Sequence, residues 1–198
     1  MGVCPPTVMR NGNLGTRLYA TVVADRSGFE RRRLVGRQHT ELSQCRMKEV
    51  MLKILLLQGA NLTFLGRREP EIYGSTTPAE LEAMLRSHAH DHAYKLEIFY
   101  TNIEGEAIDR IYQAVDEGFN GLVMNPAGFT YAGFALRDCI KGAGLPYVEV
   151  HISSIAKRNI HCVLSDVAEG MITGFGMHSY VLGLDAMLEI LKKRTIGR

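Results

Sequence analysis

From residue 53 onward, short apolar segments alternate with segments that have the pattern of helices. The first apolar segment, KILLLQ at residues 53–58, is typical of a buried strand. Thr77, Pro78 and Glu80 form the pattern of a capping box with proline at the first helical position, which predicts a helix over residues 78–92. Strands that alternate with helices form a parallel sheet covered on both faces, so this order is the strongest constraint on the fold.

The alternation continues to the end of the chain. Further strands are predicted at residues 95–101, 121–125, 146–151 and 170–174. Further helices are predicted at residues 104–117, from Thr130 as N-cap to residue 141, and at residues 179–194. We therefore predict an α/β fold: a flavodoxin-like five-stranded parallel sheet with helices on both faces and strand order 2-1-3-4-5.

The first 50 residues differ from the rest of the chain in charge and pattern. Residues 1–50 carry a net charge of +5, whereas residues 51–198 carry −3. The first segment also lacks sustained hydrophobic periodicity. We therefore predict a poorly structured basic N-terminal extension over residues 1–50 and an α/β domain over residues 51–198.

Three explanations for the extension remain open. The natural start is Met47 or Met51, or the extension is a transit peptide, or it is an arm that binds nucleic acid. The acidic residues Asp25 and Glu30 argue against a transit peptide, and the arginine triplet at residues 31–33 is too common a pattern to support the third.

Composition excludes several classes of protein. Hydrophobic residues make up 46% of the chain and charged residues 22%, which is typical of a globular protein. No run of 18 apolar residues is present, so we predict no membrane partner. A net charge of +2 gives no reason to expect nucleic acid as a partner. The cysteines (Cys4, Cys45, Cys139 and Cys162) form no C-x-x-C pair, which fits a reducing compartment and a cytoplasmic location.

Polar residues stand at the carboxyl ends of the predicted strands, where open α/β sheets bind ligands. They include Asn61, Asn125, Glu149 and His151. Amides, a carboxylate and an imidazole suit a small, polyhydroxylated, anionic ligand. Neither a G-x-G-x-x-G pattern nor a P-loop follows the first strand, and the strand ends offer no acidic pair for Mg²⁺, so we expect neither a dinucleotide, a nucleoside triphosphate nor Mg²⁺ to bind there.

Three histidines lie close together in the sequence, as the ligands of a metal ion often do. Of His88, His90 and His92, only His88 and His92 share a helix face. We therefore predict no metal site.

Residues 61–76 form an unusually long connection between a strand and a helix. Gly66 and Gly74 bracket its charged centre, and glycine permits backbone conformations that other residues avoid. The segment is therefore predicted to be a lid or a binding loop.

In this region the sequence resembles the type II 3-dehydroquinate dehydratases. The family's opening block, roughly NGPNLNLLGxREPxxYG, is matched by QGANLTFLGRREPEIYG, and its NPGAFTHTSxALRDA by NPAGFTYAGFALRDC at residues 125–139. Its PxxEVHxSN is matched by PYVEVHISS at residues 146–154, and its LSPxAxGxIxGxG by LSDVAEGMITGFG at residues 164–176. The resemblance covers residues 53–191.

The resemblance implies the dehydration of 3-dehydroquinate to 3-dehydroshikimate through an enolate, without a cofactor or metal. By position, Tyr73 would be the base, and Arg68 beside it would favour the phenolate. Asn61 would help to hold the water that stabilises the enolate. His151 would protonate the departing hydroxyl, with Glu149 orienting its ring.

The resemblance also implies a set of substrate-binding positions: Asn125, Ile152, Ser153, Tyr131, Asp138 and Arg158. Asn125 and the backbone amides near Ile152 and Ser153 would bind the substrate carboxylate. Asp138 would reach the site of a neighbouring subunit, in a homo-oligomer that is a dodecamer built from trimers.

The physical chemistry is consistent with a tyrosine base. An isolated phenol has a pKa of about 10, and lowering it by about 3 units needs roughly 4 kcal/mol. One cation at about 4 Å supplies about that much at an effective dielectric constant near 20. Arginine suits this role better than lysine because a guanidinium stays charged when it is desolvated.

The chain departs from the family pattern where substrate hydroxyls are recognised. Ala60 replaces proline, Tyr131 stands where the family has histidine, and Gly133 and Ser154 are also substitutions. The segment before Ser165 is about three residues shorter than in the family, by comparison with HAREEFRxHSYLS. Arg158 matches the first arginine of that segment, and the second has no clear counterpart. The alternative function is therefore a non-catalytic protein that binds a small carboxylate.

Overall fold

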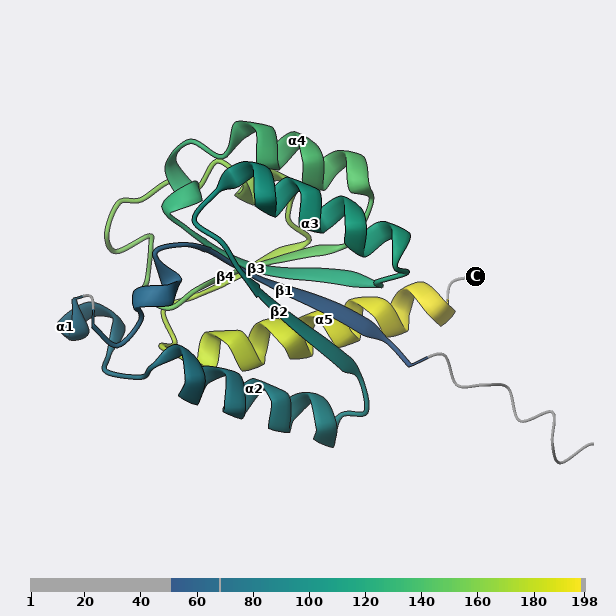
Figure 1. Cartoon of the computed structure of the whole chain (residues 1–198), viewed down its shortest axis with the longest axis horizontal. Helices are drawn as coiled ribbons and strands as arrows, with labels where there is room; N and C mark the ends of the chain where they lie inside the picture. Colours follow the sequence, from purple (N-terminus) through teal and green to yellow (C-terminus); the bar gives the residue numbers. More distant parts are fainter. Residues whose placement is uncertain (1–50, 68, 197–198) are drawn as a thin grey trace, which may run out of the picture. The chain divides into compact units, whose positions relative to one another are not determined.

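The computed structural model of the chain describes residues 51–67 and 69–196. The predicted N-terminal extension and Arg68 lie outside the described residues. The strands are β1 (Lys53–Ala60), β2 (Lys95–Tyr100), β3 (Gly121–Ala127), β4 (Tyr147–His151) and β5 (Gly170–Thr173). They form one parallel sheet in the order β2-β1-β3-β4-β5, which confirms the predicted topology (Figure 1).

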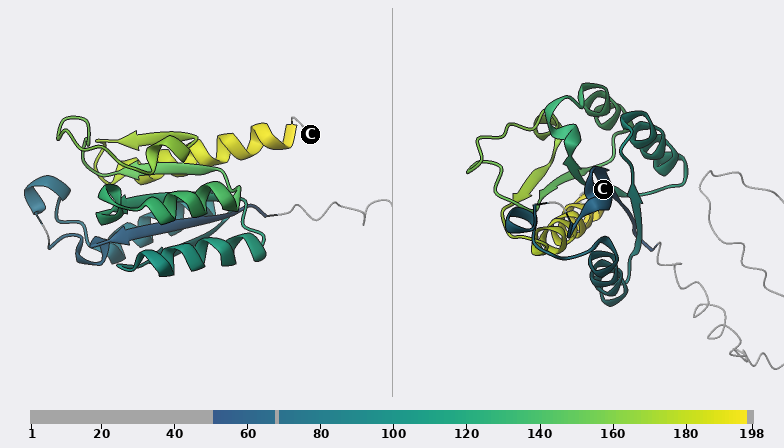
Figure 2. Two further views of the ribbon diagram at one scale, coloured as in Figure 1. Left: turned by 90° about the horizontal axis from the view of Figure 1, so that it is seen from above. Right: turned by 60° about the vertical axis from the view of Figure 1, so that its left-hand side comes forward.

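Helices cover both faces of the sheet. They are α1 (Pro70–Tyr73), α2 (Pro78–Asp91), α3 (Glu104–Asp116), α4 (Phe134–Ala143) and α5 (His178–Ile196). Helices α2 and α5 pack on one face and α3 and α4 on the other (Figure 2). Among the described residues, no helix combines the length and the apolar character needed to cross a bilayer.

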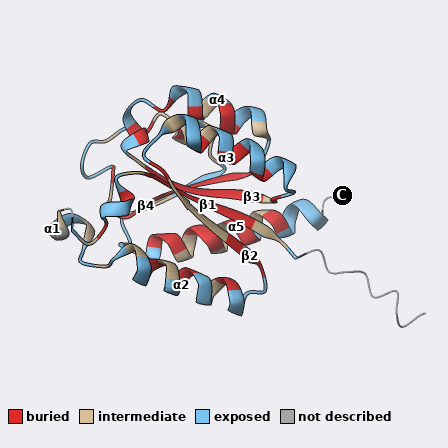
Figure 3. Ribbon diagram, in the orientation of Figure 1, coloured by how far each residue is buried: buried red, intermediate tan, exposed pale blue. Residues whose placement is uncertain are grey.

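The central strand β1 belongs to both hydrophobic cores. Ile54 and Leu56 pack in the core beneath α2 and α5, whereas Leu55 and Leu57 pack in the core beneath α3 and α4. All four side chains are fully buried, and buried residues run along the strands between the two helical layers (Figure 3). Because successive side chains of a strand point to opposite faces, a strand at the centre of the sheet needs apolar residues at every position.

The two predicted helix starts have different outcomes. The capping box of α2 is confirmed: the Thr77 hydroxyl accepts the Glu80 backbone N–H at 3.3 Å, and the Glu80 carboxylate accepts the Thr77 N–H at 2.9 Å. The predicted N-cap Thr130 is wrong, because α4 begins only at Phe134. Thr130 lies instead in the 3₁₀ helix η2 (Gly128–Tyr131), where it is buried and its carbonyl accepts the Val163 N–H at 3.0 Å.

The long connection after β1 contains two short helical turns, the 3₁₀ helix η1 (Leu62–Phe64) and α1. Gly66 and Gly74 both have a φ of +79°, so the predicted glycine positions are confirmed. A Cβ atom at Gly66 would lie 2.8 Å from the carbonyl oxygen of Ser75, so this turn requires glycine. The connection thereby returns to place Tyr73 near the carboxyl ends of the strands.

Candidate active site

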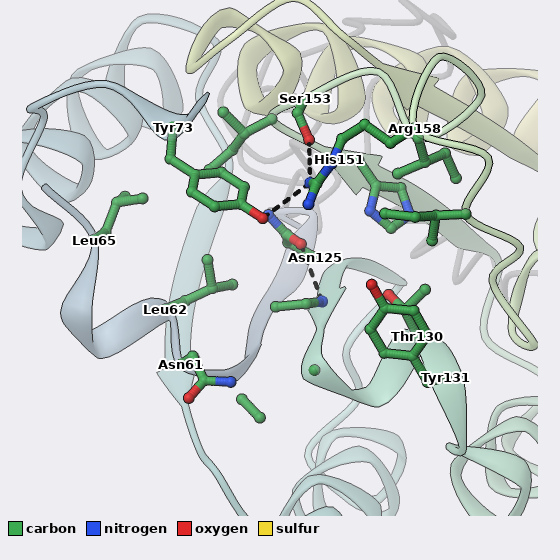
Figure 4. Close-up of a pocket in the computed structure, with 16 residues that line it drawn as sticks. Asn61, Leu62, Leu65, Tyr73, Asn125, Thr130, Tyr131, His151, Ser153 and Arg158 are labelled. Carbon is green, nitrogen blue, oxygen red and sulfur yellow. Dashed lines mark hydrogen bonds between the residues drawn. The ribbon is translucent and has the colours of Figure 1, made fainter. Parts of the chain in front are cut away.

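A pocket of about 330 Å³ lies at the carboxyl ends of β1, β3 and β4. Most of the residues singled out in the sequence line it: Asn61, Tyr73, Asn125, Tyr131, His151, Ile152, Ser153 and Arg158 (Figure 4). Parallel strands bring their carboxyl ends to one edge of the sheet, and this explains why residues 90 positions apart in the sequence meet there. The proposed base and the proposed acid therefore face one cavity.

His151 is held from behind by a buried carboxylate. Its Nε2 lies 2.7 Å from Oε1 of Glu149, which is fully buried. A carboxylate accepts hydrogen bonds, so Nε2 carries a proton and Nδ1 is left for the pocket. The Ser165 hydroxyl donates to the same oxygen at 2.8 Å, and the Tyr147 hydroxyl donates to Oε2 at 3.1 Å.

These contacts keep Glu149 ionised. Burial alone would raise the pKa of Glu149, but the hydrogen bonds from His151 and Ser165 together outweigh burial, and the pKa is lowered. Burial also raises the pKa of Tyr147 well above its usual value, so this residue remains a hydroxyl that donates to the carboxylate. The ionised carboxylate therefore holds the imidazole in place through its Nε2.

Tyr73 contacts a guanidinium that the sequence did not assign to it. Nη1 of Arg158 donates to the Tyr73 hydroxyl oxygen at 2.9 Å and to the Ser153 hydroxyl at 3.0 Å (Figure 4). The guanidinium carbon lies 5.6 Å from the centre of the Tyr73 ring. The hydrogen bond to Tyr73 is the main cause that raises the pKa of Arg158. Arg158 therefore supplies a cation directly at the phenol oxygen.

Asn125 is fixed by a buried chain of hydrogen bonds. Its Nδ2 donates to the Tyr180 hydroxyl at 2.8 Å, and that hydroxyl donates to Oε1 of Gln58 at 2.9 Å. Its Oδ1 accepts the Ala127 N–H at 3.2 Å. Because an amide nitrogen has two hydrogens, one N–H of Asn125 remains for a ligand oxygen in the pocket.

The floor of the pocket carries backbone strain. Ala127 has φ +47° and ψ −113°, a conformation that favours glycine. The next residue is Gly128, where a Cβ atom would lie 2.9 Å from Cβ of Ala60 and 3.2 Å from Nδ2 of Asn61. The family pattern has Gly-Ala at these two positions, and this chain has Ala-Gly. Asn61 also has a positive φ of +80°, and its N–H donates to Oδ1 of Asn102 at 2.8 Å.

Two other predicted residues lie apart from the pocket lining. Glu149 is behind His151, and Asp138 is exposed on α4. The role of Asp138 in a neighbouring subunit's site stays a prediction, as does the role of Arg68, which lies outside the described residues.

Sequence reasoning missed the apolar part of the pocket. Leu62, Leu65, Ile155 and Ile160 line it together with the buried Thr130. Isoleucine and leucine are common in every hydrophobic core, so no signal in the sequence marked them for this position.

A set of possible metal ligands is present beside the pocket, but its chemistry does not suit a metal. Glu149, His151 and Cys162 have donor atoms within 4.8 Å of one another. Burial and the neighbouring Glu149 carboxylate together raise the pKa of the Cys162 thiol to about 11. A thiol that keeps its proton is a poor metal ligand.

A sequence model of the family described as "Dehydroquinase class II" matches residues 52–188. The chain belongs to this family. It is 43% identical over 146 residues to the 3-dehydroquinate dehydratase of Thioalkalivibrio sulfidiphilus, covering 72% of this chain and 99% of that protein. It is 42% identical over 146 residues to catabolic 3-dehydroquinase 1 of Neosartorya fischeri, covering 72% of this chain and 97% of that protein. The crystal structure of the type II dehydroquinase from Butyrivibrio crossotus matches with a TM-score of 0.67 at 34% identity, over 69% of this chain and 97% of that chain.

All residues that line the pocket lie within the range that matches the family model. The blocks that carry Tyr73, Asn125 and His151 fall within the matched residues. The shortened segment that carries Arg158 also lies there, and in this dehydroquinase it closes one wall of the pocket with Ile155 and Ile160.

Proposed function

We propose that the chain is a 3-dehydroquinate dehydratase that removes water from 3-dehydroquinate to give 3-dehydroshikimate. One observation carries the proposal. A phenol bonded to a guanidinium (Tyr73 with Arg158) and an imidazole backed by a buried carboxylate (His151 with Glu149) line one pocket in a member of this family. A protein that only binds a carboxylate needs neither pair.

The proposed reaction starts at the carbon next to the substrate ketone. The Tyr73 phenolate removes a proton from that carbon, and the electron pair of the C–H bond forms an enolate. Arg158 favours the phenolate beforehand because its charge lies at the phenol oxygen. Asn61, at the rim of the pocket, helps to hold a water that donates a hydrogen bond to the enolate oxygen.

The second half of the reaction breaks the carbon–oxygen bond. His151, protonated on both nitrogens, gives a proton to the departing hydroxyl, which leaves as water while the enolate collapses to the conjugated ketone. Glu149 accepts the hydrogen of Nε2 and holds the ring in place while Nδ1 gives up its proton. Proton return from Tyr73 to His151 through solvent completes the cycle.

The test is turnover by the purified full chain with 3-dehydroquinate, followed by the ultraviolet absorbance of the conjugated product. We expect wild type to turn over and Tyr73→Phe to lose turnover while it still binds substrate in calorimetry. Tyr112→Phe is the matched control, since Tyr112 is exposed on α3 and lies outside the pocket lining. If wild type and Tyr73→Phe bind substrate but are equally inactive, the non-catalytic alternative replaces this proposal.

We also propose that the protein acts in the cytoplasm as a dodecamer built from trimers. The family resemblance supports the assembly, together with the exposure of Asp138 and of Phe134 at the start of α4. Light scattering on the eluting full chain tests the assembly. A monomer that turns over at the full rate would contradict the role of Asp138 in a neighbouring subunit's site.

A further inference from the structure

A second cluster of ligand-type side chains lies on the helices α2 and α5, away from the pocket. His88 and His92 belong to the last turn of α2 and its C-cap, and Asp185 belongs to α5. One donor atom from each residue lies within 4.8 Å of the other two. None of the three lines the pocket, and Tyr94, which contacts His88, precedes β2 at the opposite edge of the sheet.

His88 and Asp185 are already spaced like two ligands of one ion. Nε2 of His88 lies 3.1 Å from Oδ1 of Asp185. Two donor atoms bound tetrahedrally at about 2.0–2.2 Å from one Zn²⁺ lie about 3.3–3.5 Å apart. The pair therefore needs only a small displacement to admit an ion between its two atoms.

The other nitrogen of His88 has the partner that metal-binding histidines require. Nδ1 lies 2.9 Å from the Tyr94 hydroxyl. A tyrosine hydroxyl can either donate to Nδ1 or accept from it. A hydrogen bond at Nδ1 fixes the ring and leaves Nε2 to the metal.

His92 has one ring nitrogen, Nε2, that is free to bind a metal ion. Nδ1 of His92 lies 2.9 Å from the backbone carbonyl oxygen of His88. A carbonyl only accepts hydrogen bonds, so Nδ1 carries the proton and Nε2 of the neutral ring carries the lone pair. The ring stacks on His88 with 4.1 Å between centroids, and its exposed position leaves it room to turn toward the ion.

We propose that His88, His92 and Asp185 bind one divalent transition-metal ion, with Zn²⁺ as the best fit, and that the ion ties α2 to α5. Two neutral imidazoles and a carboxylate, completed by water, are a ligand set that suits zinc, and a spacing of four residues puts both imidazoles on one helix face. A simple ion pair would account for His88 and Asp185, but it would not explain why the metal-binding nitrogen of a second histidine, His92, lies beside them. The sequence predicted no metal site because the third ligand is 97 residues from His88.

The test is binding of Zn²⁺ to the untagged full chain after treatment with a chelator, measured by calorimetry and by thermal unfolding. We expect one Zn²⁺ ion to bind per chain and the Tm to rise on addition of Zn²⁺. His92→Gln should weaken binding by more than the roughly 10- to 100-fold that loss of an outer partner costs, and Asp185→Asn should weaken it similarly. His90→Gln is the matched control, because His90 is exposed on the same helix and is not part of the cluster.

Cobalt substitution separates this site from cysteine-containing alternatives. Co²⁺ bound by imidazole and carboxylate gives visible d–d bands without the near-ultraviolet charge-transfer band of a thiolate ligand. We expect those d–d bands in wild type and in His90→Gln, and their loss in His92→Gln. Equal Zn²⁺ binding by His90→Gln and His92→Gln, a thiolate band, or no binding by wild type would each overturn the proposal. Circular dichroism of His92→Gln shows that any loss of binding occurs in a folded protein.

Discussion

Replacement of Arg158 by glutamine tests the electrostatic part of the mechanism most directly. Nη1 of Arg158 lies 2.9 Å from the Tyr73 oxygen, which puts the centre of the guanidinium charge about 4 Å from a phenolate at that oxygen. The interaction is worth about 1 kcal/mol in water and about 4 kcal/mol at an effective dielectric constant of 20. Arg158 is exposed, so solvent screens it until bound substrate displaces water from the pocket.

The expected consequence is a loss of rate rather than a loss of fold. At 1.36 kcal/mol for each factor of ten, Arg158→Gln should lower kcat at neutral pH about 5-fold to 1,000-fold. Arg158→Lys keeps the charge but loses the planar guanidinium, so it should retain an intermediate rate.

The assay is the full pH profile of kcat and KM, followed by product absorbance, for wild type and both variants. Arg158→Gln with an unchanged kcat across the profile would refute the assignment of the cation to this residue. A parallel profile of Arg68→Gln then shows whether the arginine implied by the family resemblance acts in its place. A change confined to KM would mean that Arg158 binds substrate and does not activate Tyr73.

Three further predictions follow from the pocket and its surroundings. Ala127→Gly should raise stability by about 1 kcal/mol, because relief of the strained φ exceeds the added flexibility of the unfolded chain; Tm measures this, and a lower Tm would contradict it. Burial would raise the pKa of Glu149, but the hydrogen bonds from His151 and Ser165 lower it. The carboxylate therefore stabilises the folded state above pH about 4.3, the usual pKa of glutamate, and this stabilisation is lost as the pH falls through the lowered pKa. Glu149→Gln should therefore lower kcat and neutral-pH stability, with the gap in denaturant midpoint to wild type narrowing in acid; a constant gap at all pH values would count against the ionised carboxylate. Deletion of residues 1–46 should leave turnover and assembly unchanged, as measured by product absorbance and light scattering, and loss of either would show that the extension contributes to the domain.

Local patterns predicted the sheet because each strand carries its own evidence in the sequence. The apolar run of β1 indicated burial on both faces, and the box at Thr77 located the start of α2 within one residue. Thr130 has the same side chain as Thr77 but does not cap a helix. Its backbone is bonded to Val163, a contact that depends on the folded position of a distant loop and leaves no local pattern.

The candidate site also combines residues that local patterns located with residues whose position depends on distant contacts. His151 is the last residue of β4 and Asn125 lies near the carboxyl end of β3, so a parallel sheet brings them together whatever the loops do. The partner of Tyr73 depends on how the segment around Arg158 folds over the pocket, and that segment is the part in which this chain departs from its family pattern. The proximity of Asp185 to His88 likewise depends on the packing of α5 against α2, which the periodicity of either helix alone does not specify.

The reversed pair at residues 127 and 128 restricts the order in which these two residues can be exchanged. On this backbone, an Ala-Ala pair would combine the positive φ of Ala127 with a Cβ atom 2.9 Å from Cβ of Ala60. A Gly-Gly pair avoids both problems, so on this backbone two glycines are the more accessible intermediate between the Gly-Ala and Ala-Gly orders. The Ala127→Gly variant has this intermediate pair, so its stability and turnover can be measured directly.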